Sequence, residues 1–374
     1  MRVGINLLWV KPGKSGGIES YIRNLLDGFS NGEFKEINQF VLFVSLDNHE
    51  TFETYIDDKK FIKVICNIKS SDVAKRIIWE NLFLDKYAKK NELDCMFIPV
   101  YSKPLLHKGS CAYITVIHDL QALHYPEYFT KKKLLWLKFA WKRAAQTSNK
   151  IIAISKFVKG DIVDKLHINP SKIDVIYNPI KISNSHNDTV IGIDKYNIKN
   201  KEYFYAVSSM LPHKNLKTLI YLIKKIVDDD MDRLPKKLVL SGVGGSQERD
   251  LIELIKELGI ERNVILTGFI SNEERDSLYA NAFAFLFPSL FEGFGMPVIE
   301  GLMQGIPVIT TNVTSIPEVS KMQATYVEDP FSLEEWVEKI YIAMAKPPQE
   351  FSGENYSIET ISKQYIDRFL EFKK

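Results

Sequence analysis

The sequence lacks the features that define several large classes of protein. Its three cysteines form no Cys-x-x-Cys pair, which argues against a disulfide scaffold and fits a reducing compartment. No apolar run approaches the roughly 20 residues that span a bilayer, and the first ten residues are typical of a β-strand rather than a signal peptide. The formal net charge is only +2, so no global field favours nucleic acid as a partner.

Motifs for metals and cofactors are also missing. The sequence contains no His-Glu-x-x-His or EF-hand pattern, so we expect no metal. Asp228, Asp229, Asp230 and Asp232 lie in a charged segment after a predicted helix, which is typical of a solvated loop. The glycine-rich stretch 240–246 does not follow the Gly-x-Gly-x-x-Gly pattern and lies outside the first βαβ unit, so we expect no dinucleotide cofactor.

Short apolar runs alternate with longer amphipathic segments along most of the chain. Strands that are buried on both faces and separated by helices predict parallel sheets covered by helices, an α/β fold. The predicted strands are 3–10, 40–46, 94–100, 112–120, 150–155 and 172–178, then 202–209, 237–242, 263–269, 282–289 and 307–311. The predicted helices are 17–29, 73–90 and 131–147, then 214–227, 246–258, 272–280 and 296–304. Ser155 is expected to cap a further helix.

The 374 residues suit two domains of ordinary size. A polar stretch without periodicity, 181–200, interrupts the alternation and is predicted to connect them. We therefore expect a first domain over 1–180, a second over 201–355, and a C-terminal helix over 356–374 that packs back on the first domain. In open α/β sheets, ligands bind outside the carboxyl ends of the strands.

The stretch 288–319, PSLFEGFGMPVIEGLMQGIPVITTNVTSIPEV, carries the strongest chemical signal. A predicted strand ends in a glycine-rich loop, and Pro297 suits the first turn of the following helix. Glycines permit close backbone approach to a ligand, and helix N-termini attract anions. Glu292 and Glu300, eight residues apart, can accept hydrogen bonds from sugar or ribose hydroxyls. The alternative is that both glutamates only cap the helix.

This stretch resembles the group 1, family-four retaining glycosyltransferases, whose hallmark is two glutamates separated by seven residues within Pro-Ser-x-x-Glu-Gly-Phe-Gly-x-Pro-x-x-Glu. The resemblance extends over essentially the whole chain and implies a GT-B fold, with two Rossmann-like domains facing a central cleft. It also implies that Glu292 faces the donor sugar, that Glu300 holds the ribose, and that Phe294, Gly295 and Met296 offer backbone amides to the donor. It gives Gly268 and Phe269 a place along the nucleotide base.

A second motif, 207–219, lies where a predicted strand meets a helix. Lys214 is a natural partner for a diphosphate there, because a cation beside free N–H groups stabilises a leaving dianion; the alternative is a solvated lysine. Similar glycosyltransferases usually carry Arg five residues earlier, where this chain has Ser209. A basic residue, His213, directly precedes the lysine, as in some relatives. Ser209 can donate a hydrogen bond but carries no charge.

The N-terminal half offers two weaker signals. Gly16 and Gly17 follow the first strand and can bring backbone close to a phosphate or to an acceptor. His118 falls at the carboxyl end of a strand, although a lone histidine is more often structural. The resemblance places His118 near the reacting sugar and the glycine pair among the donor contacts.

The helix 131–147 combines basic with aromatic residues. It can pack on the first sheet, contact an anionic membrane or lipid-linked acceptor, or do both. The overall expectation is a metal-independent, retaining hexosyltransferase located in the cytoplasm, with this helix as its means of peripheral contact with the inner membrane face.

The PHKN segment is similar to that of surface-polysaccharide mannosyl- and rhamnosyltransferases, which makes GDP-mannose the first choice of donor and UDP- or dTDP-sugars the next. The expected acceptor is a glycan, most simply one linked to a lipid. The alternatives are a non-catalytic nucleotide-sugar-binding partner protein and a related GT-B enzyme such as an epimerase.

Overall fold

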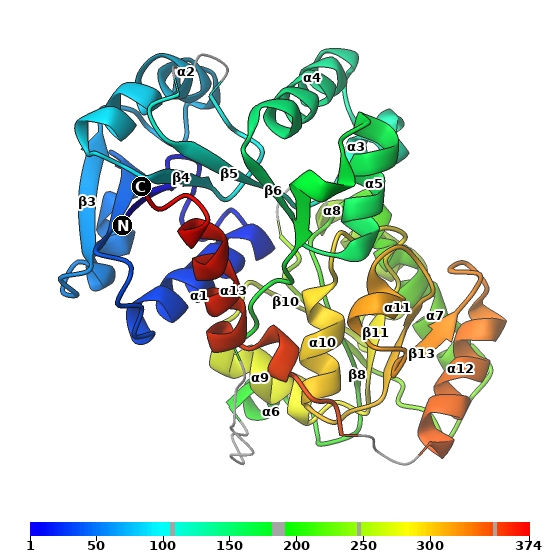
Figure 1. The fold of residues 1–374 in the computed structure, drawn as a ribbon. Coiled ribbons are helices and arrows are strands. Elements are labelled where there is room, and N and C mark those ends of the chain that lie inside the picture. Colours follow the sequence, from blue (N-terminus) through cyan, green and yellow to red (C-terminus); the bar gives the residue numbers. More distant parts are fainter. Residues whose placement is uncertain (105–108, 182–190, 245–247, 347–349) are drawn as a thin grey trace. The chain divides into compact units, whose positions relative to one another are not determined.

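The computed structural model describes residues 1–104, 109–181, 191–244, 248–346 and 350–374 (Figure 1). The chain divides into two compact units: residues 1–181 with 354–374, and residues 182–353. Part of the predicted connection, 182–190, and residues 245–246 of the glycine-rich stretch lie outside the described residues. Each unit is built on one parallel sheet, which confirms the α/β class.

The first unit contains a seven-stranded sheet in the order β3-β2-β1-β4-β5-β6-β7. Its strands are β1 (Arg2–Asn6), β2 (Gln39–Ser45), β3 (Phe61–Cys66), β4 (Cys95–Ile98), β5 (Ala112–Ile117), β6 (Lys150–Ala153) and β7 (Ile173–Val175). Its helices are α1 (Gly17–Asn31), α2 (Val73–Lys90), α3 (Gln121–His124), α4 (Lys131–Thr147), α5 (Lys156–Leu166) and α13 (Ile358–Leu370). Short 3₁₀ turns are η1 (His49–Tyr55), η2 (Pro126–Tyr128), η3 (Pro170–Lys172) and η5 (Glu354–Tyr356). Ser155 caps α5 as predicted, because its side chain accepts a hydrogen bond from Val158 N.

The second unit repeats this plan with six strands in the order β10-β9-β8-β11-β12-β13. The strands are β8 (Phe204–Val207), β9 (Leu238–Ser241), β10 (Val264–Gly268), β11 (Ala284–Phe287), β12 (Val308–Thr311) and β13 (Thr325–Val327). The helices are α6 (Ile191–Tyr196), α7 (Leu216–Asp228), α8 (Glu248–Glu257), α9 (Asn272–Ala280), α10 (Met296–Met303), α11 (Ile316–Val319) and α12 (Leu333–Ala345). One 3₁₀ turn, η4 (Pro212–Lys214), precedes α7.

The central strands are continuous apolar runs because helices cover both faces of the sheet. Every residue of β4, β9, β11 and β12 is buried. The sequence prediction missed β3 and β13, which lie at the edges of their sheets. Edge strands carry fewer buried positions, as the partly exposed middle of β3 shows, so their apolar signal is weaker. It also missed α12 and α6; α6 occupies part of the predicted connection and packs on α9.

In both sheets the strand order reverses beside the first strand of the unit, between β1 and β4 and between β8 and β11. Ligands of open α/β sheets bind outside the carboxyl ends of the strands at such a reversal. The loops that follow β1 and β4, and those that follow β8 and β11, are therefore the places to look for function. Among the described residues, no helix is long and apolar enough to cross a membrane.

The C-terminal helix α13 packs against α1 within the first unit, as Figure 1 shows for the red and blue helices. The hydroxyls of Tyr21 and Tyr365 share a buried hydrogen bond of 2.7 Å. Gly28 lets the two helices approach closely, because a Cβ there would lie 1.9 Å from Ser362 Oγ and 2.8 Å from Ile358 Cγ2. The C-terminal helix is thus an integral part of the first unit.

This close approach predicts opposite effects for two glycine-to-alanine substitutions. Gly28→Ala should lower the free energy of unfolding by about 1–3 kcal/mol, because α13 must shift to admit the methyl group. Gly160→Ala in α5 should raise it by about 0.5–1 kcal/mol, because alanine favours the helix and a Cβ there meets no described atom within 4 Å. Urea denaturation of both variants measures the difference; a Gly28→Ala protein as stable as wild type would contradict the packing.

Candidate functional site

The centre of the second unit's ligand edge is an ion pair between two neighbouring loops. Lys214 lies in the turn η4 after β8, and Glu292 lies in the loop after β11. The Lys214 Nζ donates a hydrogen bond of 2.6 Å to Glu292 Oε1. Both side chains are largely buried, at 16% and 11% exposed. The strand reversal between β8 and β11 therefore joins the two strongest sequence signals in one place.

The loop after β11 is fixed by hydrogen bonds from residues that follow β12. Thr314 Oγ1 accepts from Glu292 N at 3.0 Å. The buried hydroxyl of Ser315 donates to the carbonyl oxygens of Glu292 and Phe294 at 2.9 and 3.0 Å. On the other side, Leu290 N donates to His213 O at 2.7 Å. These contacts hold the Glu292 carboxylate in position beside Lys214 without help from a ligand.

Gly295 is the N-cap residue directly before α10, and its φ of +96° is one that glycine adopts without strain. Met296 opens the helix, and Pro297 lies in its first turn as predicted. The N-cap position is occupied by a glycine, so the helix start has no side-chain cap. The Glu292 carboxylate pairs with Lys214 and Glu300 lies beyond the first turn, so the alternative that both glutamates serve only as caps does not hold.

Glu300 is held by two residues of α9 that the sequence analysis did not find. The hydroxyl of Tyr279 lies 3.3 Å from Glu300 Oε2 and 3.2 Å from Pro297 O. Arg275 Nε lies 3.9 Å from the same carboxylate oxygen. Nothing in the sequence marks Arg275 or Tyr279, because α9 reads as an ordinary polar helix and its packing on α10 is a tertiary feature.

The two residues expected beside Lys214 differ in environment. Ser209 is exposed on the loop after β8. His213 is buried, and burial together with the neighbouring Lys214 ammonium lowers the pKa of its imidazole to about 3. His213 is consequently neutral at pH 7 and adds no cation to that of Lys214.

The loops after β9 and β10 border the same edge of this sheet. Gly242 N donates to Gly268 O at 2.8 Å, and a Cβ on Gly242 would lie 2.8 Å from Ser208 O. Gly268 has φ +68°. Phe269 is 79% exposed and lies beside Gly244. The loops after β8, β9 and β10 are thus packed closely together through glycines, and the exposed ring of Phe269 lies beside them.

In the first unit, His118 follows β5 and is held as a neutral imidazole. Its Nε2 lies 2.8 Å from Pro99 O, which can only accept, so this nitrogen carries the proton and Nδ1 is left as an acceptor. The ring makes an edge-to-face contact with Tyr21, with centroids 5.0 Å apart. Burial lowers the pKa of His118 to about 4, and the Pro99 hydrogen bond offsets only part of this effect.

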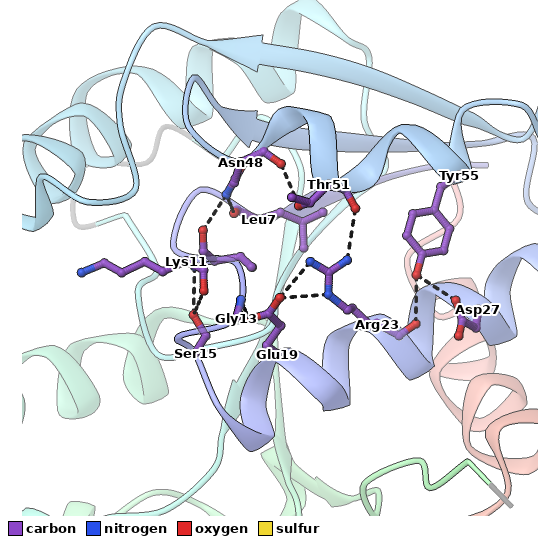
Figure 2. A network of polar contacts seen from close by, with 11 residues as sticks. Leu7, Lys11, Gly13, Ser15, Glu19, Arg23, Asp27, Asn48, Thr51 and Tyr55 are labelled. Carbon is purple, nitrogen blue, oxygen red and sulfur yellow. Dashed lines mark hydrogen bonds and ion pairs between the residues drawn. The ribbon is translucent and has the colours of Figure 1, made fainter. Parts of the chain in front are cut away.

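Gly16 and Gly17 lie at the end of a loop that a polar network fixes after β1 (Figure 2). Asn48 Nδ2 donates to Leu7 O and Val10 O. Glu19 Oε2 accepts from Gly13 N, while Arg23 donates twice to Glu19 Oε1 and once to Thr51 O (Figure 2). Gly16 itself has φ +57°, a value that favours glycine.

The helix α4 has two apolar sides with different surroundings. Leu137, Ala140, Trp141, Ala144 and Ala145 are buried against the first unit. Leu135, Trp136 and Phe139 are exposed, and Leu135 reaches 69%. Core packing is therefore present, and an exposed apolar strip remains beside the exposed lysines of the helix.

The acidic run at the end of α7 pairs with lysines instead of forming a cluster. Asp228 pairs with Lys224, and Asp229 with Lys225. No group of three or more His, Cys, Asp or Glu in the described part of the chain is placed to hold a metal ion. The three cysteines are buried and unpaired with one another.

Two family models match the chain. Glycosyltransferase Family 4 matches residues 15–184, and Glycosyl transferases group 1 matches residues 192–357. Together they include every strand of the two sheets except β1, and the group 1 match includes the Lys214–Glu292 pair. The chain belongs to the group 1 glycosyltransferases. The resemblance inferred from the 288–319 motif is thereby confirmed.

Two curated relatives of this glycosyltransferase are named O-antigen chain mannosyltransferases. It is 26% identical over 265 residues to O-antigen chain mannosyltransferase B of Escherichia coli, with 67% of this chain and 69% of that protein covered. It is 29% identical over 211 residues to O-antigen chain mannosyltransferase RfbU of Salmonella typhimurium, with 56% and 55% covered. The matched region thus spans about half to two thirds of these relatives.

Solved structures confirm the GT-B fold of the glycosyltransferase. Anabaena Alr3699/HepE in complex with UDP and glucose has a TM-score of 0.75 at 16% identity, with 99% of this chain and 100% of that chain covered. WaaG, a glycosyltransferase of lipopolysaccharide biosynthesis, has a TM-score of 0.66 at 17% identity, with 98% and 95% covered.

The depressed pKa values of the two site histidines predict their behaviour in an NMR titration. The C2–H resonances of His118 and His213 can be assigned with His118→Gln and His213→Gln. Their chemical shifts should keep the values of a neutral imidazole from pH 8 down to about pH 5. Because the unfolded state takes up these protons near pH 6.5, the free energy of unfolding should fall as the pH drops from about 6.5 toward 4. A midpoint near 6.5 for either resonance would contradict the described burial.

Proposed function

We propose that the protein is a retaining, metal-independent hexosyltransferase that transfers mannose from GDP-mannose to a lipid-linked glycan in polysaccharide biosynthesis. The observation that carries the proposal is the Lys214–Glu292 pair, which stands at the strand reversal of the unit matched by the group 1 model. In this proposal the second unit holds the donor, and the first unit holds the acceptor.

The donor diphosphate needs positive charge as it leaves. Lys214 supplies a cation, and the backbone N–H groups at the start of α10, from Phe294 to Met296, supply oriented dipoles. Ser209 is exposed on the neighbouring loop and supplies one neutral donor in place of a guanidinium. His213 is neutral, so its contribution is to hold the loop through its backbone carbonyl.

The two glutamates have separate tasks on the donor. Glu292 accepts hydrogen bonds from the hydroxyls of the transferred sugar. Glu300 accepts hydrogen bonds from the ribose, and Tyr279 with Arg275 fix its orientation. Gly268 and Phe269 border the base, where the exposed aromatic ring offers a stacking surface.

The reaction follows from the resemblance to retaining glycosyltransferases. The bond between the anomeric carbon and the diphosphate oxygen breaks, and the diphosphate keeps the electron pair. The acceptor hydroxyl attacks from the same face and passes its proton to a donor phosphate oxygen. Nδ1 of His118 is a hydrogen-bond acceptor for a hydroxyl of the reacting sugar, and Gly16 with Gly17 brings backbone to the same substrate.

The choice of donor rests on the mannosyltransferase names of the relatives. A thermal-shift screen with GDP-, UDP- and dTDP-sugars tests it, because a ligand that binds only the folded state raises the melting temperature. GDP-mannose should give the largest shift. A larger shift with UDP-glucose would change the assigned donor to UDP-glucose and leave the proposed reaction class unchanged.

Substitutions in the ion pair should change GDP affinity in opposite directions. Lys214→Met should weaken GDP binding at least about tenfold, because it removes the cation that contacts the diphosphate. Glu292→Gln should leave GDP binding equal or tighter, because it removes the anion that competes for Lys214. Both variants should lose about 100-fold or more in kcat/KM for transfer. Calorimetric titration with GDP and a radiolabelled transfer assay measure these effects.

Lys224→Met is the matched control for this experiment, since Lys224 pairs with Asp228 at the far end of α7. It should bind GDP and transfer sugar like wild type. Near-normal transfer by Lys214→Met or by Glu292→Gln would refute the assigned roles.

The stereochemistry of the product tests the retaining mechanism separately. The one-bond C1–H1 coupling of the newly linked mannose should show the same anomeric configuration as in the donor, in an NMR spectrum of the product. An inverted product would contradict the mechanism without changing the family.

A non-catalytic nucleotide-sugar-binding protein is the second candidate, favoured only by Ser209 at the position of the usual arginine. Transfer or donor hydrolysis above background by the wild type excludes it.

The exposed strip of Leu135, Trp136 and Phe139 on α4 supports a further part of the proposal, peripheral contact with an anionic membrane. Sedimentation with vesicles that contain anionic lipid should deplete the wild type from solution.

A further inference from the structure

A pocket in the first unit contains a buried cation that the proposed reaction does not use. It measures about 430 Å³ and lies between α2, α4 and the segments that follow β1 and β4. Its walls include Trp9, Ile77, Trp136 and Leu137. Because the segments after β1 and β4 flank the strand reversal of this sheet, the pocket lies at the unit's ligand edge.

Arg76 of α2 lines this pocket without a hydrogen bond to account for its burial. Its side chain is only 11% exposed, and its Nε and Nη1 atoms are buried with no hydrogen-bond partner among the described residues. Glu80 Oε1 is 4.0 Å from Nη1, beyond hydrogen-bond distance. Buried guanidinium N–H groups that make no hydrogen bond are costly unless a ligand accepts from them, even where a carboxylate balances the charge.

The other charged groups of the pocket do not satisfy Arg76. Glu80 is 1% exposed and accepts a hydrogen bond of 3.0 Å from Asn6 Nδ2. Burial raises the pKa of the Glu80 carboxyl, and the charge of Arg76 with the Asn6 hydrogen bond opposes that rise. Lys103 Nζ is directed at Thr147, donating to its carbonyl and hydroxyl oxygens at 2.8 Å. Lys133 of α4 also lines the pocket, as a third basic side chain beside Arg76 and Lys103.

The surroundings of the pocket are apolar as well as basic. Apolar side chains of both flanking helices stand exposed: Val73, Ile78, Leu82 and Phe83 on α2, and Leu135, Trp136 and Phe139 on α4. Exposed lysines accompany them, including Lys75, Lys86, Lys89, Lys131, Lys132, Lys138 and Lys142. An acidic sugar alone would need the cation but not this apolar margin, whereas a phosphate on a hydrocarbon chain would use both.

We propose that this pocket binds the phosphate that joins the acceptor to an apolar carrier, with Arg76 donating hydrogen bonds to the phosphate oxygens and the carrier lying along α2 and α4. The proposal rests on the proposed glycosyl transfer and names the subsite for its acceptor. Arg76 is a binding residue in this account and takes no part in bond making.

Farnesyl diphosphate is a suitable probe, because it carries the predicted anion on a short isoprenoid chain. It should bind the full-length wild type and change the fluorescence of Trp9 and Trp136. Arg76→Gln should weaken this binding at least about tenfold, because it removes charge-assisted hydrogen bonds. Lys90→Gln removes an exposed charge from the last turn of the same helix, away from the pocket lining, and should stay within about twofold of wild type.

Trp136→Ala provides a second variant, which removes an apolar wall of the pocket and keeps the Arg76 cation. It should weaken farnesyl diphosphate and leave the weak binding of inorganic diphosphate unchanged. Farnesol and glucuronic acid should each bind far more weakly than farnesyl diphosphate. Tighter binding of glucuronic acid, or equal binding of inorganic diphosphate, would overturn the carrier assignment in favour of an acidic sugar or a free anion.

The outcome separates this proposal from the proposed function. Arg76→Gln should bind GDP like wild type and, in transfer to a lipid-linked acceptor, raise KM while leaving kcat within about twofold. Farnesyl diphosphate binding that is insensitive to Arg76→Gln would overturn the subsite alone. Absence of GDP binding by the wild type would instead count against the proposed function.

Discussion

The ion pair between Lys214 and Glu292 is the contact on which the proposed donor site depends. It joins loops 78 residues apart in the chain because β8 and β11 are neighbours where the strand order reverses. Both charges are largely buried, so they lose most of their hydration. This loss costs free energy unless the geometry of the pair is good enough for their attraction to offset it. Two hydrogen bonds provide that geometry: Glu292 N donates to Thr314 Oγ1, and the Ser315 hydroxyl donates to Glu292 O.

In each unit, other polar groups with proposed roles also have partners. Glu300 is held by Tyr279 and lies near Arg275, while His118 is oriented by Pro99. Groups prepared in this way lose little freedom when a substrate binds, so the oriented charges act on it directly. Arg76 differs from Glu300 and His118, since its buried Nε and Nη1 have no hydrogen-bond partner among the described residues. An unmet buried donor indicates a ligand more strongly than a satisfied one does.

The sequence predicted the α/β class, most of the central strands and the motif residues at the ends of β8 and β11. Its apolar runs are strong there because helices bury both faces of the sheet. The edge strands β3 and β13 were missed, since partial exposure dilutes the same signal. The partners Arg275, Tyr279, Thr314 and Ser315 could not be predicted either, because they reach the site through packing between helices and strands that sequence spacing does not encode. The roles assigned to the site residues remain predictions.

Histidine chemistry shows a similar limit. The residue type of His213 suggested a second cation beside Lys214, but burial and the lysine itself keep the imidazole neutral. Only the fold reveals that environment. The α4 helix is the converse case, because the sequence left core packing and surface contact open, and the structure gives α4 a buried apolar side and an exposed one.

A crystal structure of the protein with bound GDP tests the central claim most directly. The account predicts the β-phosphate within hydrogen-bond distance of Lys214 Nζ and of the backbone amides between Phe294 and Met296. A diphosphate bound elsewhere, with Lys214 still paired to Glu292, would contradict it.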